Sequence, residues 1–537
     1  MSSVSPDELN AVQRCIEKAA RGRSVAAACI YGSKAAGYAR PDSDVDVIIV
    51  LDDYRYRVKY TYVKESGVDV SALLVDKGAL QKDALGAQLG EFVAGRLLHV
   101  YQPITNAELL ARVEQDIKRR VILEELQEMV KSAGAFAAEI SFPLEYIAFA
   151  KVKRRAAMYP NVAYSYSKTY TVNGRNLEHA MEGYRRALAD IVVQDPGLFS
   201  INGEMLQLSR DRIGFARGRH ALRLEKKLQR FGSYFVHSYA GRRMFHLVAK
   251  EAKSKIRRHI RQKVEFPPFL SCPACAYWQI PEGVVVPDRS DWVEKVAEKH
   301  GVSDYSVKKR RLGNTISRTT LYELKGKGGE LKIAAKELAR TKAVKWAALS
   351  MWTAQKFHAD PAFRLGTIYR ALRHLRTLGL LTPEIEAVAL DGRTIATRFV
   401  EGRSLADVAK GALAGREGTE LLAEAGRQMS AVHSTGACFG NIKPKNVIIN
   451  DGLWFTDMEQ FVFEGGDPAW DLAQFVSWGL KGTANSVAAA KIASDFLSGY
   501  GIEKNIALLA SKRHMETFYP VLSPQVARAI KNVVRSF

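Results

Sequence analysis

Two aspartates that lie two residues apart, Asp44 and Asp46, are the side chains best suited to chemistry in this chain. Apolar segments flank them at residues 25–30 and 47–51, and both segments are predicted to be strands. A spacing of two residues puts both carboxylates on the same face of a strand. Two such carboxylates repel each other unless a divalent cation lies between them, and Mg²⁺ prefers hard oxygen ligands of this kind. The pair therefore predicts a metal site.

The residues around this pair supply other parts of a phosphate-transfer site. Gly32 and Ser33 form a turn that lets backbone N–H groups and a hydroxyl approach a triphosphate. A third carboxylate, Asp69, lies in a later predicted strand, VDVSALLVD. Three carboxylates, two metal ions and this turn suit in-line displacement at phosphorus, in which we expect Asp69 to help activate the incoming hydroxyl. The alternative is a surface turn that carries scattered acids.

The segment YGSKAAGYARPDSDVDV (31–47) resembles the DNA polymerase β nucleotidyltransferase superfamily, in particular its minimal nucleotidyltransferase branch. The pattern of that branch is Gly-Ser, a turn of small residues, and Ser-Asp-x-Asp. The matching residues are Gly32, Ser33, Gly37, Ser43, Asp44 and Asp46, with Asp69 as the third acid by order and strand context. The resemblance implies that the three aspartates hold two Mg²⁺ ions. It also implies that Gly32, Ser33 and Ser43 bind an NTP, for which ATP is favoured.

Composition limits the class of protein. A chain of 537 residues is too long for one core and predicts about three domains. Hydrophobic residues make up 47% and charged residues 25%, as in soluble globular proteins, and no apolar run is long enough to span a bilayer. The polar N-terminus does not resemble a signal or transit peptide. The five cysteines favour a reducing, cytoplasmic location over a disulfide framework, and no membrane partner is expected.

The net charge of +22 predicts a polyanionic partner, and RNA, especially tRNA, is favoured over a protein acceptor. Residues 106–270 carry roughly +13 of this charge. Within this block, residues 106–158 have the periodicity of helices. Four basic residues then lie beside four tyrosines and suit contact with a nucleic-acid backbone and stacking on bases: Lys151, Lys153, Arg154, Arg155, Tyr159, Tyr164, Tyr166 and Tyr170. The alternative is a basic helix followed by a strand with half-buried tyrosines.

The rest of the middle region gives weaker signals. A helix at 180–194 and a hairpin with its turn at Asn202-Gly203 are consistent with a winged helix. Residues 214–263 are helical by pattern and very basic, which fits a nucleic-acid face or a solvated cationic helix. A lone CxxC at residues 272–275 indicates a turn or half of a zinc site, because no second ligand pair is visible. The segment IPEGVVVPD (280–288) is predicted to be a linker.

The segment HSTGACFGNIKPKNVIINDGLWFTDMEQF (433–461) resembles the catalytic segment of protein-kinase-like enzymes, near the atypical archaeal and RIO-like kinases. Lys443 and Asn446 match the pattern, and Asp457 matches the metal-binding Asp. The strand LKIAAKEL would place Lys336 on the α- and β-phosphates, after a predicted hairpin at 322–332. Asp471 matches a structural Asp on a helix. The resemblance implies that Lys336 and Lys443 bind nucleotide and that Asn446 and Asp457 bind Mg²⁺.

Two departures from the kinase pattern matter for activity. The catalytic Asp is replaced by Asn441, and an amide cannot accept the proton of a substrate hydroxyl. The Glu that pairs with the strand lysine falls near Ile368, which cannot form an ion pair. The segment RRLGNTISRTT (310–320) has one glycine where a nucleotide-binding loop is expected. These features predict a domain that binds ATP and Mg²⁺ but transfers phosphate poorly or not at all, as in a pseudokinase.

The sequence therefore predicts a multidomain protein of α/β and α+β class. The expected parts are a nucleotidyltransferase domain (1–105), a basic helical domain (106–270), a linker with the CxxC (271–299) and a two-lobed kinase-like domain (300–537). The expected function is Mg²⁺-dependent transfer of a nucleotidyl group from an NTP to a hydroxyl of RNA, tRNA or protein, with the kinase-like domain in a regulatory role. The alternatives are an atypical serine/threonine-type kinase, a toxin–antitoxin-like arrangement, and a non-catalytic nucleic-acid-binding protein.

Overall fold

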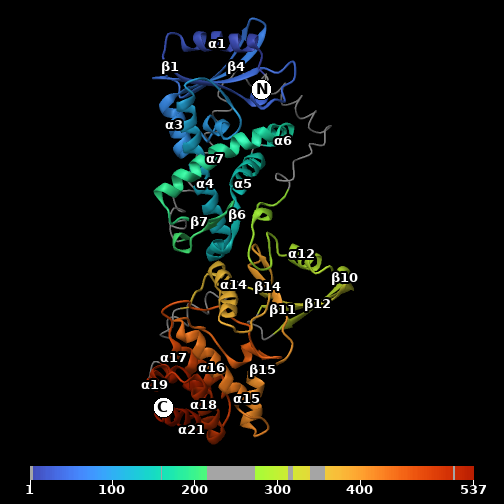
Figure 1. Cartoon of the computed structure of the whole chain (residues 1–537), viewed down its shortest axis with the longest axis vertical. Helices are drawn as coiled ribbons and strands as arrows, with labels where there is room; N and C mark the ends of the chain where they lie inside the picture. The colour runs from blue at the N-terminus through green and yellow to red at the C-terminus, as the bar shows by residue number, and fades with distance from the viewer. Residues whose placement is uncertain (1–3, 159, 214–271, 313–317, 339–356, 512–513) are drawn as a thin grey trace. The chain divides into compact units, whose positions relative to one another are not determined.

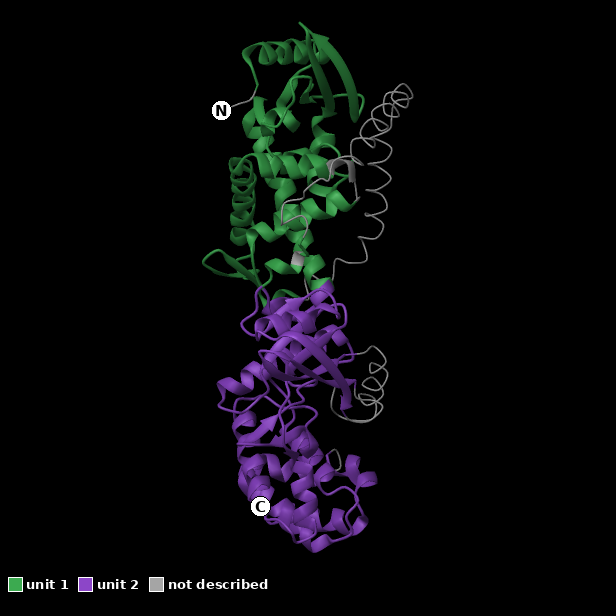
Figure 2. Ribbon diagram, turned by 90° about the vertical axis from the view of Figure 1, so that its right-hand side faces the viewer, with its two compact units in different colours: residues 1–131, 141–278 green, residues 132–140, 279–537 purple. Residues whose placement is uncertain are grey.

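The computed structural model describes residues 4–158, 160–213, 272–312, 318–338, 357–511 and 514–537 (Figure 1). These residues form two compact units (Figure 2). Unit 1 comprises residues 1–131 and 141–278, and unit 2 comprises residues 132–140 and 279–537. Among the described helices, none combines the length and the apolar character that crossing a membrane requires.

Unit 1 contains a five-stranded mixed sheet in the order β3-β4-β2-β1-β5. Its strands are β1 Val25–Tyr31, β2 Val45–Leu51, β3 Val58–Glu65, β4 Val68–Asp76 and β5 Gln102–Thr105. Strands β2 and β4 run parallel, whereas β1 is antiparallel to β2 and β3 is antiparallel to β4. The strands predicted on either side of the aspartate pair are therefore present, and VDVSALLVD forms β4.

Helix α1 (Pro6–Ala20) covers one face of this sheet and α3 (Lys77–Gly86) lies on the other side (Figure 1). A capping box between Ser5 and Glu8 fixes the start of α1. The apolar side of α1 packs on alternate residues of the strands, including Val45, Val47 and Ile49 of β2. Because side chains alternate along a strand, Asp46 lies on the opposite face, away from α1.

Of the middle region, residues 106–131 and the described residues from 141 to 213 belong to the same unit as this sheet, whereas residues 132–140 belong to unit 2. The helices of the middle region are α4 Ala107–Ala133, α5 Leu144–Met158, α6 Pro160–Val172 and α7 Gly174–Gln194. The strand considered after Tyr159 is instead helix α6. Tyr166 and Tyr170 lie four residues apart, so they share one side of that helix, where they pack with Val152 of α5. The hairpin predicted at Asn202-Gly203 is present as β7 (Phe199–Asn202) and β8 (Met205–Leu208). Strand β6 (Ser141–Pro143) pairs with β8 and adds a third strand to this small sheet.

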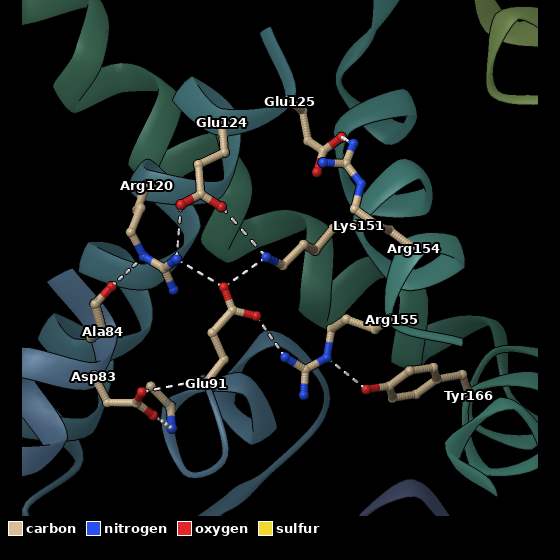
Figure 3. Close-up of polar contacts among 11 residues, drawn as sticks. Asp83, Ala84, Glu91, Arg120, Glu124, Glu125, Lys151, Arg154, Arg155 and Tyr166 are labelled. Carbon is tan, nitrogen blue, oxygen red and sulfur yellow. Dashed lines mark hydrogen bonds and ion pairs between the residues drawn. The ribbon is translucent and has the colours of Figure 1, made fainter. Parts of the chain in front are cut away.

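A buried ionic network ties the loop after α3 to helices α4 and α5 (Figure 3). The carboxylate of Glu91 accepts from Arg120 at 2.8 Å, from Lys151 at 2.7 Å and from Arg155 at 2.7 Å. Arg155 also donates to the Tyr166 hydroxyl at 2.9 Å. Lys151, Arg155 and Tyr166 are all buried. The nucleic-acid role considered for these three residues is therefore wrong, because their charges and rings are used inside the unit.

Glu125 of α4 gives a testable dependence of stability on pH. Burial raises the pKa of its carboxyl to about 7, although Arg154 opposes this, and its Oε1 has no hydrogen-bond partner within the described residues. A carboxyl with a raised folded-state pKa costs stability as pH rises through about 4.5 to 7. We expect Glu125→Gln to stabilise the protein by about 3 kcal/mol more at pH 8 than at pH 5. Urea unfolding at both pH values measures this, and an equal gain at both would contradict it. Glu108→Gln, at an exposed position of the same helix, is the control.

Unit 2 contains a six-stranded sheet in the order β10-β11-β12-β14-β13-β9. Its strands are β9 Val284–Val286, β10 Ser303–Leu312, β11 Thr319–Lys327, β12 Gly329–Glu337, β13 Ile385–Ala389 and β14 Thr394–Arg398. The hairpin predicted at 322–332 is the β11–β12 turn. The linker predicted at 280–288 is wrong, because the apolar run Val284–Val286 pairs in parallel with β13. Helix α12 (Asp291–Lys299) follows and packs Trp292 into the same core.

The remainder of unit 2 is mainly helical and holds a small sheet in the order β15-β16-β17. Its strands are β15 Arg403–Ser404, β16 Val447–Ile449 and β17 Leu453–Phe455. Its helices of nine or more residues are α14 Pro361–Thr377, α15 Leu405–Leu413, α16 Glu420–Ser434, α17 Pro468–Gly479, α18 Ser486–Tyr500 and α21 Pro524–Arg535. The buried carboxylate of Asp471 on α17 accepts from the Phe439 backbone N–H at 2.6 Å and contacts His433 Nε2 at 3.1 Å. This agrees with a structural role for Asp471.

Short elements complete the fold. They are α2 Gly32–Ala36, α19 Glu503–Ala507, α20 Met515–Phe518, η1 Ala94–Leu98, η2 Gly134–Glu139, η3 Arg210–Arg212, η4 Ala274–Tyr277, η5 Pro444–Asn446, η6 Leu508–Ala510 and η7 Tyr519–Val521. In the CxxC segment Cys272 is half-buried and Cys275 is buried. The described residues around them form no cluster of three possible metal ligands. The basic helices predicted at 214–263 lie outside the described residues.

Candidate active site

The aspartate pair lies where the β1–β2 connection returns to the sheet. Tyr31 at the end of β1 is paired in register with Asp46 of β2, and Asp44 lies just before β2 begins. Gly32 follows Tyr31 with φ of +76°, and a Cβ atom placed there would lie 2.4 Å from Asp46 Oδ2. Only glycine lets the backbone of the turn come this close to the carboxylate.

The register of the sheet brings the third aspartate beside the pair. Parallel strands β2 and β4 pair Val45 with Val70, so Asp44 and Asp69 lie at the same level, one residue before the paired valines. Asp69 is exposed, and Asp44 and Asp46 are half-buried. All three fall on the strand positions that alternate with the α1-facing valines. The predicted carboxylates are thus assembled on one face, at one end of two neighbouring strands.

The remaining predicted residues shape the turn between β1 and β2. Ser33 lies in α2 and its carbonyl accepts from the backbone N–H of Tyr38 at 3.1 Å. The Ser43 hydroxyl accepts from the backbone N–H of Arg40 at 2.9 Å, which closes the end of the turn just before Asp44. Lys34 is buried and its Nζ bonds to Glu8 of α1 at 2.6 Å. Lys34 therefore anchors the turn to α1.

Some neighbours of the carboxylates could not be identified from the motif. The Arg96 guanidinium of η1 lies 5.2 Å from the Tyr31 ring centroid and 4.4 Å from that of Phe92. Tyr38 hydrogen-bonds to the hydroxyls of Ser165 and Thr169. Helix α6 thus lines the turn that follows Gly32, although it lies more than 120 residues later in the sequence. In the sequence, only Tyr31, directly before Gly32 and Ser33, indicated that aromatic residues lie beside the turn.

The segment that carries the three aspartates matches the model of one protein family. Residues 13–78 match the family model described as polymerase beta, nucleotidyltransferase. This match supports a nucleotidyltransferase domain in the N-terminal part of unit 1. It begins within α1 and ends at the start of α3, and the six motif residues and Asp69 fall inside its range. The protein is accordingly a transferase in general terms. No curated protein matches the chain.

The donor set of the nucleotidyltransferase domain fits Mg²⁺ and a triphosphate. Asp44, Asp46 and Asp69 offer carboxylate oxygens, the ligands that Mg²⁺ prefers. The close approach of Gly32 to Asp46 puts backbone groups of the turn beside the carboxylates, where phosphate oxygens would bind. The half-buried positions of Asp44 and Asp46 leave both side chains partly accessible to solvent.

Gly32→Ala tests the close approach. We expect about a hundredfold loss of nucleotidyl transfer, because the new Cβ displaces the Asp46 carboxylate. Gly37→Ala is a matched control: Gly37 has φ of +79°, but a Cβ there would meet no atom within 4 Å. Both variants carry the backbone cost of about 1–2 kcal/mol for a left-handed alanine, so both lose stability. Transfer rates measured well below each variant's melting temperature separate the two effects, and equal losses would refute the role of Gly32.

Unit 2 brings three of the kinase-pattern residues together. Lys336 Nζ on β12 lies 2.5 Å from Asp457 Oδ1, just after β17. Asn446 Nδ2 donates to Asp457 Oδ2 at 3.3 Å. Burial alone would lower the pKa of Lys336, but the carboxylates of Asp457 and Glu459 raise it well above its usual value. The lysine is therefore held charged beside the predicted metal ligand.

The ion pair expected from helix α14 is replaced by another one. Ile368 of α14 is buried, whereas Lys336 Nζ lies 2.9 Å from Glu459 Oε2, two residues after Asp457. Arg364 of α14, fully buried, pairs with the other oxygen of Glu459. The ion pair with Lys336 that was expected from a glutamate on α14 is thus made by Glu459, which Arg364 of α14 holds in place. Sequence reasoning missed Glu459 because it searched for the acid on the helix alone.

The remaining kinase-pattern residues have other side-chain partners. Lys443 Nζ lies 4.1 Å from the ring centroid of Trp478. Asn441 Oδ1 accepts from Gln474 Nε2 at 3.3 Å, so the amide has a structural partner. The centre of the predicted nucleotide-binding loop, residues 313–317, lies outside the described residues. A kinase-like fold for residues 300–537 therefore stays a prediction.

Proposed function

We propose that the protein transfers a nucleotidyl group from an NTP, with ATP favoured, to a hydroxyl acceptor. The observation that carries this proposal is the face shared by Asp44, Asp46 and Asp69 beside Gly32. In the proposed reaction Asp44 and Asp46 hold two Mg²⁺ ions with help from Asp69, and Gly32, Ser33 and Ser43 orient the triphosphate. Bound Mg²⁺ would neutralise charge on the triphosphate and on the pyrophosphate leaving group.

Asp69 has a separate role in this proposal. It is the exposed member of the three aspartates, so an acceptor can reach it from solvent. A carboxylate at this position can take the proton from the attacking hydroxyl, provided that the hydroxyl lies within hydrogen-bonding distance. The acceptor itself is proposed from charge: the chain carries +22, and most of the excess in residues 106–270 falls on residues 214–271. RNA, tRNA in particular, is therefore favoured over protein.

A paired label-transfer assay tests the function. The protein, Mg²⁺ and a mixture of cellular RNA and protein receive ATP labelled at the α-phosphate or at the γ-phosphate. We expect α-label to enter RNA, and this transfer to vanish in an Asp44→Ala/Asp46→Ala variant. Nuclease or protease sensitivity of the product identifies the acceptor. Transfer of γ-label alone, lost in Asp457→Ala, would overturn the proposal and indicate an atypical kinase.

A second nucleotide site in unit 2 is favoured by the contact of Lys336 with Asp457. We propose that this site binds ATP with Mg²⁺ held by Asn446 and Asp457, and that it regulates rather than phosphorylates. The amide of Asn441 cannot act as a base, which argues against rapid phosphoryl transfer. Nucleotide binding at this site can be measured separately from the nucleotidyl-transfer reaction.

Lys336→Met tests the regulatory site. We expect the variant to lose one of two nucleotide-binding sites, because Lys336 is the cation that would meet the phosphates. Calorimetric titration with a non-hydrolysable ATP analogue and Mg²⁺ gives the number of sites. Lys332→Met on the same strand is the control, since Lys332 is paired with Glu401 at the surface. One site in the wild type that persists unchanged in Lys336→Met would refute nucleotide binding by unit 2.

A further inference from the structure

Strand β3 and the residues before it carry an unusual alternation of aromatic and basic side chains. The segment YRYRVKYTYVK (54–64) holds four tyrosines and four cations. β3 is the edge strand of the unit 1 sheet, next to β4. Tyr56 is 55% exposed and Tyr62 is 63% exposed, which is unusual for rings of this size. An exposed aromatic edge strand in a sheet that carries the catalytic carboxylates requires an explanation.

The tyrosines form an ordered surface. The rings of Tyr60 and Tyr62 are stacked, with centroids 5.6 Å apart and planes 27° apart. Tyr60 is held from behind, because its hydroxyl lies 2.9 Å from that of Tyr31 and its ring contacts Phe92 edge-on. Arg55 and Lys59 lie 6.0 Å and 5.8 Å from the ring centroid of Tyr56. The surface therefore presents rings in fixed orientations with cations beside them.

The sheet register puts this surface next to the carboxylates. Tyr62 pairs with Ser71 of β4, and Ser71 pairs with Asp46 of β2. Directly paired residues share a face of the sheet, so the Tyr62 ring lies on the face that carries Asp46. Two residues further along β3, on the same face, Lys64 lies directly opposite Asp69 of β4. A chain lying on β3 would therefore meet an exposed cation and then the aspartate proposed to accept a proton.

We propose that the tyrosine surface of Tyr56, Tyr60 and Tyr62 binds the 3′ end of a single-stranded nucleic acid, whose terminal hydroxyl is the acceptor. Unpaired bases expose ring faces that stack on tyrosines, whereas the bases of a duplex are already stacked on each other. Arg55, Arg57, Lys59 and Lys64 are all exposed, so their side chains can neutralise phosphates. A protein acceptor has no repeated planar groups and no regular negative charge to match them.

This inference rests on the proposed nucleotidyl transfer and names its acceptor. The 3′ oxygen forms a bond to the α-phosphorus of the NTP, and the bond from that phosphorus to the bridging oxygen of the β-phosphate breaks. Pyrophosphate leaves, and the proton of the hydroxyl passes to the Asp69 carboxylate. Binding on β3 would hold the hydroxyl near Asp69, which raises the rate by proximity rather than by chemistry. The tyrosines are thus positioning residues.

Binding of a defined probe tests the surface. Full-length protein is titrated into a fluorescein-labelled 12-nucleotide single-stranded RNA, the matching DNA and the RNA duplex, and anisotropy is recorded. We expect Tyr60→Ala/Tyr62→Ala to weaken binding of the single strands about tenfold. Tyr62→Phe, which keeps the ring, should bind as the wild type does. Tyr519→Ala, at an exposed tyrosine of unit 2, is the control for loss of any surface ring. Comparison of the single-stranded RNA with the DNA shows whether the surface prefers ribose or deoxyribose.

The outcomes separate this inference from the proposed function. In Tyr60→Ala/Tyr62→Ala, weaker binding of the single strands, a higher KM for the oligonucleotide and little change in KM for the NTP would support binding of the acceptor by the tyrosine surface. Unchanged binding in Tyr60→Ala/Tyr62→Ala overturns it, as does preferential binding of the duplex. Transfer of α-label to protein alone, dependent on Asp44 and Asp46, also overturns it while leaving nucleotidyl transfer intact. Loss of all α-label transfer would instead overturn the proposed function, and single-strand binding would still decide the role of the tyrosines.

Discussion

We expect Asp46→Asn to lower the rate of nucleotidyl transfer by about a thousandfold, while the protein stays as stable as the wild type or becomes slightly more stable. The loss is expected because the change removes a carboxylate proposed to hold metal, and such a ligand is worth several kcal/mol in the transition state. The stability follows from charge, because Asp44 and Asp46 lie on one face and repel each other without a cation. A damaged fold would lower both quantities, so the combination identifies a functional residue.

Two measurements and one control make this prediction sharp. Single-turnover transfer of α-label gives the rate, and thermal unfolding with and without Mg²⁺ gives the stability. Mg²⁺ that binds the folded state raises the melting temperature of the wild type, and this rise should be lost in Asp46→Asn. Asp42→Asn is the control, since Asp42 is an exposed acid of the same turn. A rate within tenfold of the wild type in Asp46→Asn would exclude the proposed metal site.

The placement of Asp44 and Asp46 beside Gly32 could be predicted because these residues lie close together in the sequence. Strand alternation is a local property, so the spacing of Asp44 and Asp46 sufficed to put both on one face. The turn glycine was visible for the same reason. Asp69 was harder, because its position depends on which strands pair. The parallel pairing of β2 with β4 was settled by the core under α1, and no local pattern encodes it.

The parts that could not be predicted depend on pairs of residues distant in sequence. Lys151 and Arg155 looked like a nucleic-acid surface, since a run of basic residues does not reveal the buried acid that neutralises it. Glu91, that acid, lies about sixty residues earlier in an unremarkable loop. Glu459 was missed in the same way, because its partner Arg364 is 95 positions away. Ionic pairing across a fold leaves no periodicity in the sequence.

The second large effect expected is on stability and concerns Glu91. Its carboxylate is shared by Arg120, Lys151 and Arg155, and all four side chains are largely buried. Glu91→Gln keeps the shape but leaves the three cations without their shared anion inside the unit. Breaking a buried ionic group in this way costs about 3–5 kcal/mol, which is a large part of the stability of a typical domain. We therefore expect unit 1 to unfold at a much lower temperature.

Hydrogen exchange measures this loss in the right part of the chain, because the two units need not unfold together. Amides of α4 and α5 should exchange faster in Glu91→Gln, whereas those of unit 2 should not change. Glu178→Gln is the control, since Glu178 pairs with Arg185 at the surface of the same unit. Equal exchange in the two variants would show that the network contributes little.

Acid provides an independent test of the same network. Burial alone would raise the pKa of Glu91, but Lys151, Arg120 and Arg155 lower it well below its usual value. A carboxyl with a lowered folded-state pKa contributes stability above its unfolded-state pKa of about 4.5 and loses it as pH falls toward the folded-state value. The stability difference between the wild type and Glu91→Gln should therefore narrow steadily below pH 4.5. A constant difference would mean that packing, and not charge, causes the loss of stability.

The Glu91→Gln variant should also reduce nucleotidyl transfer. The network fixes the loop that leads to Arg96, and the Arg96 guanidinium lies against Tyr31, which is paired with Asp46.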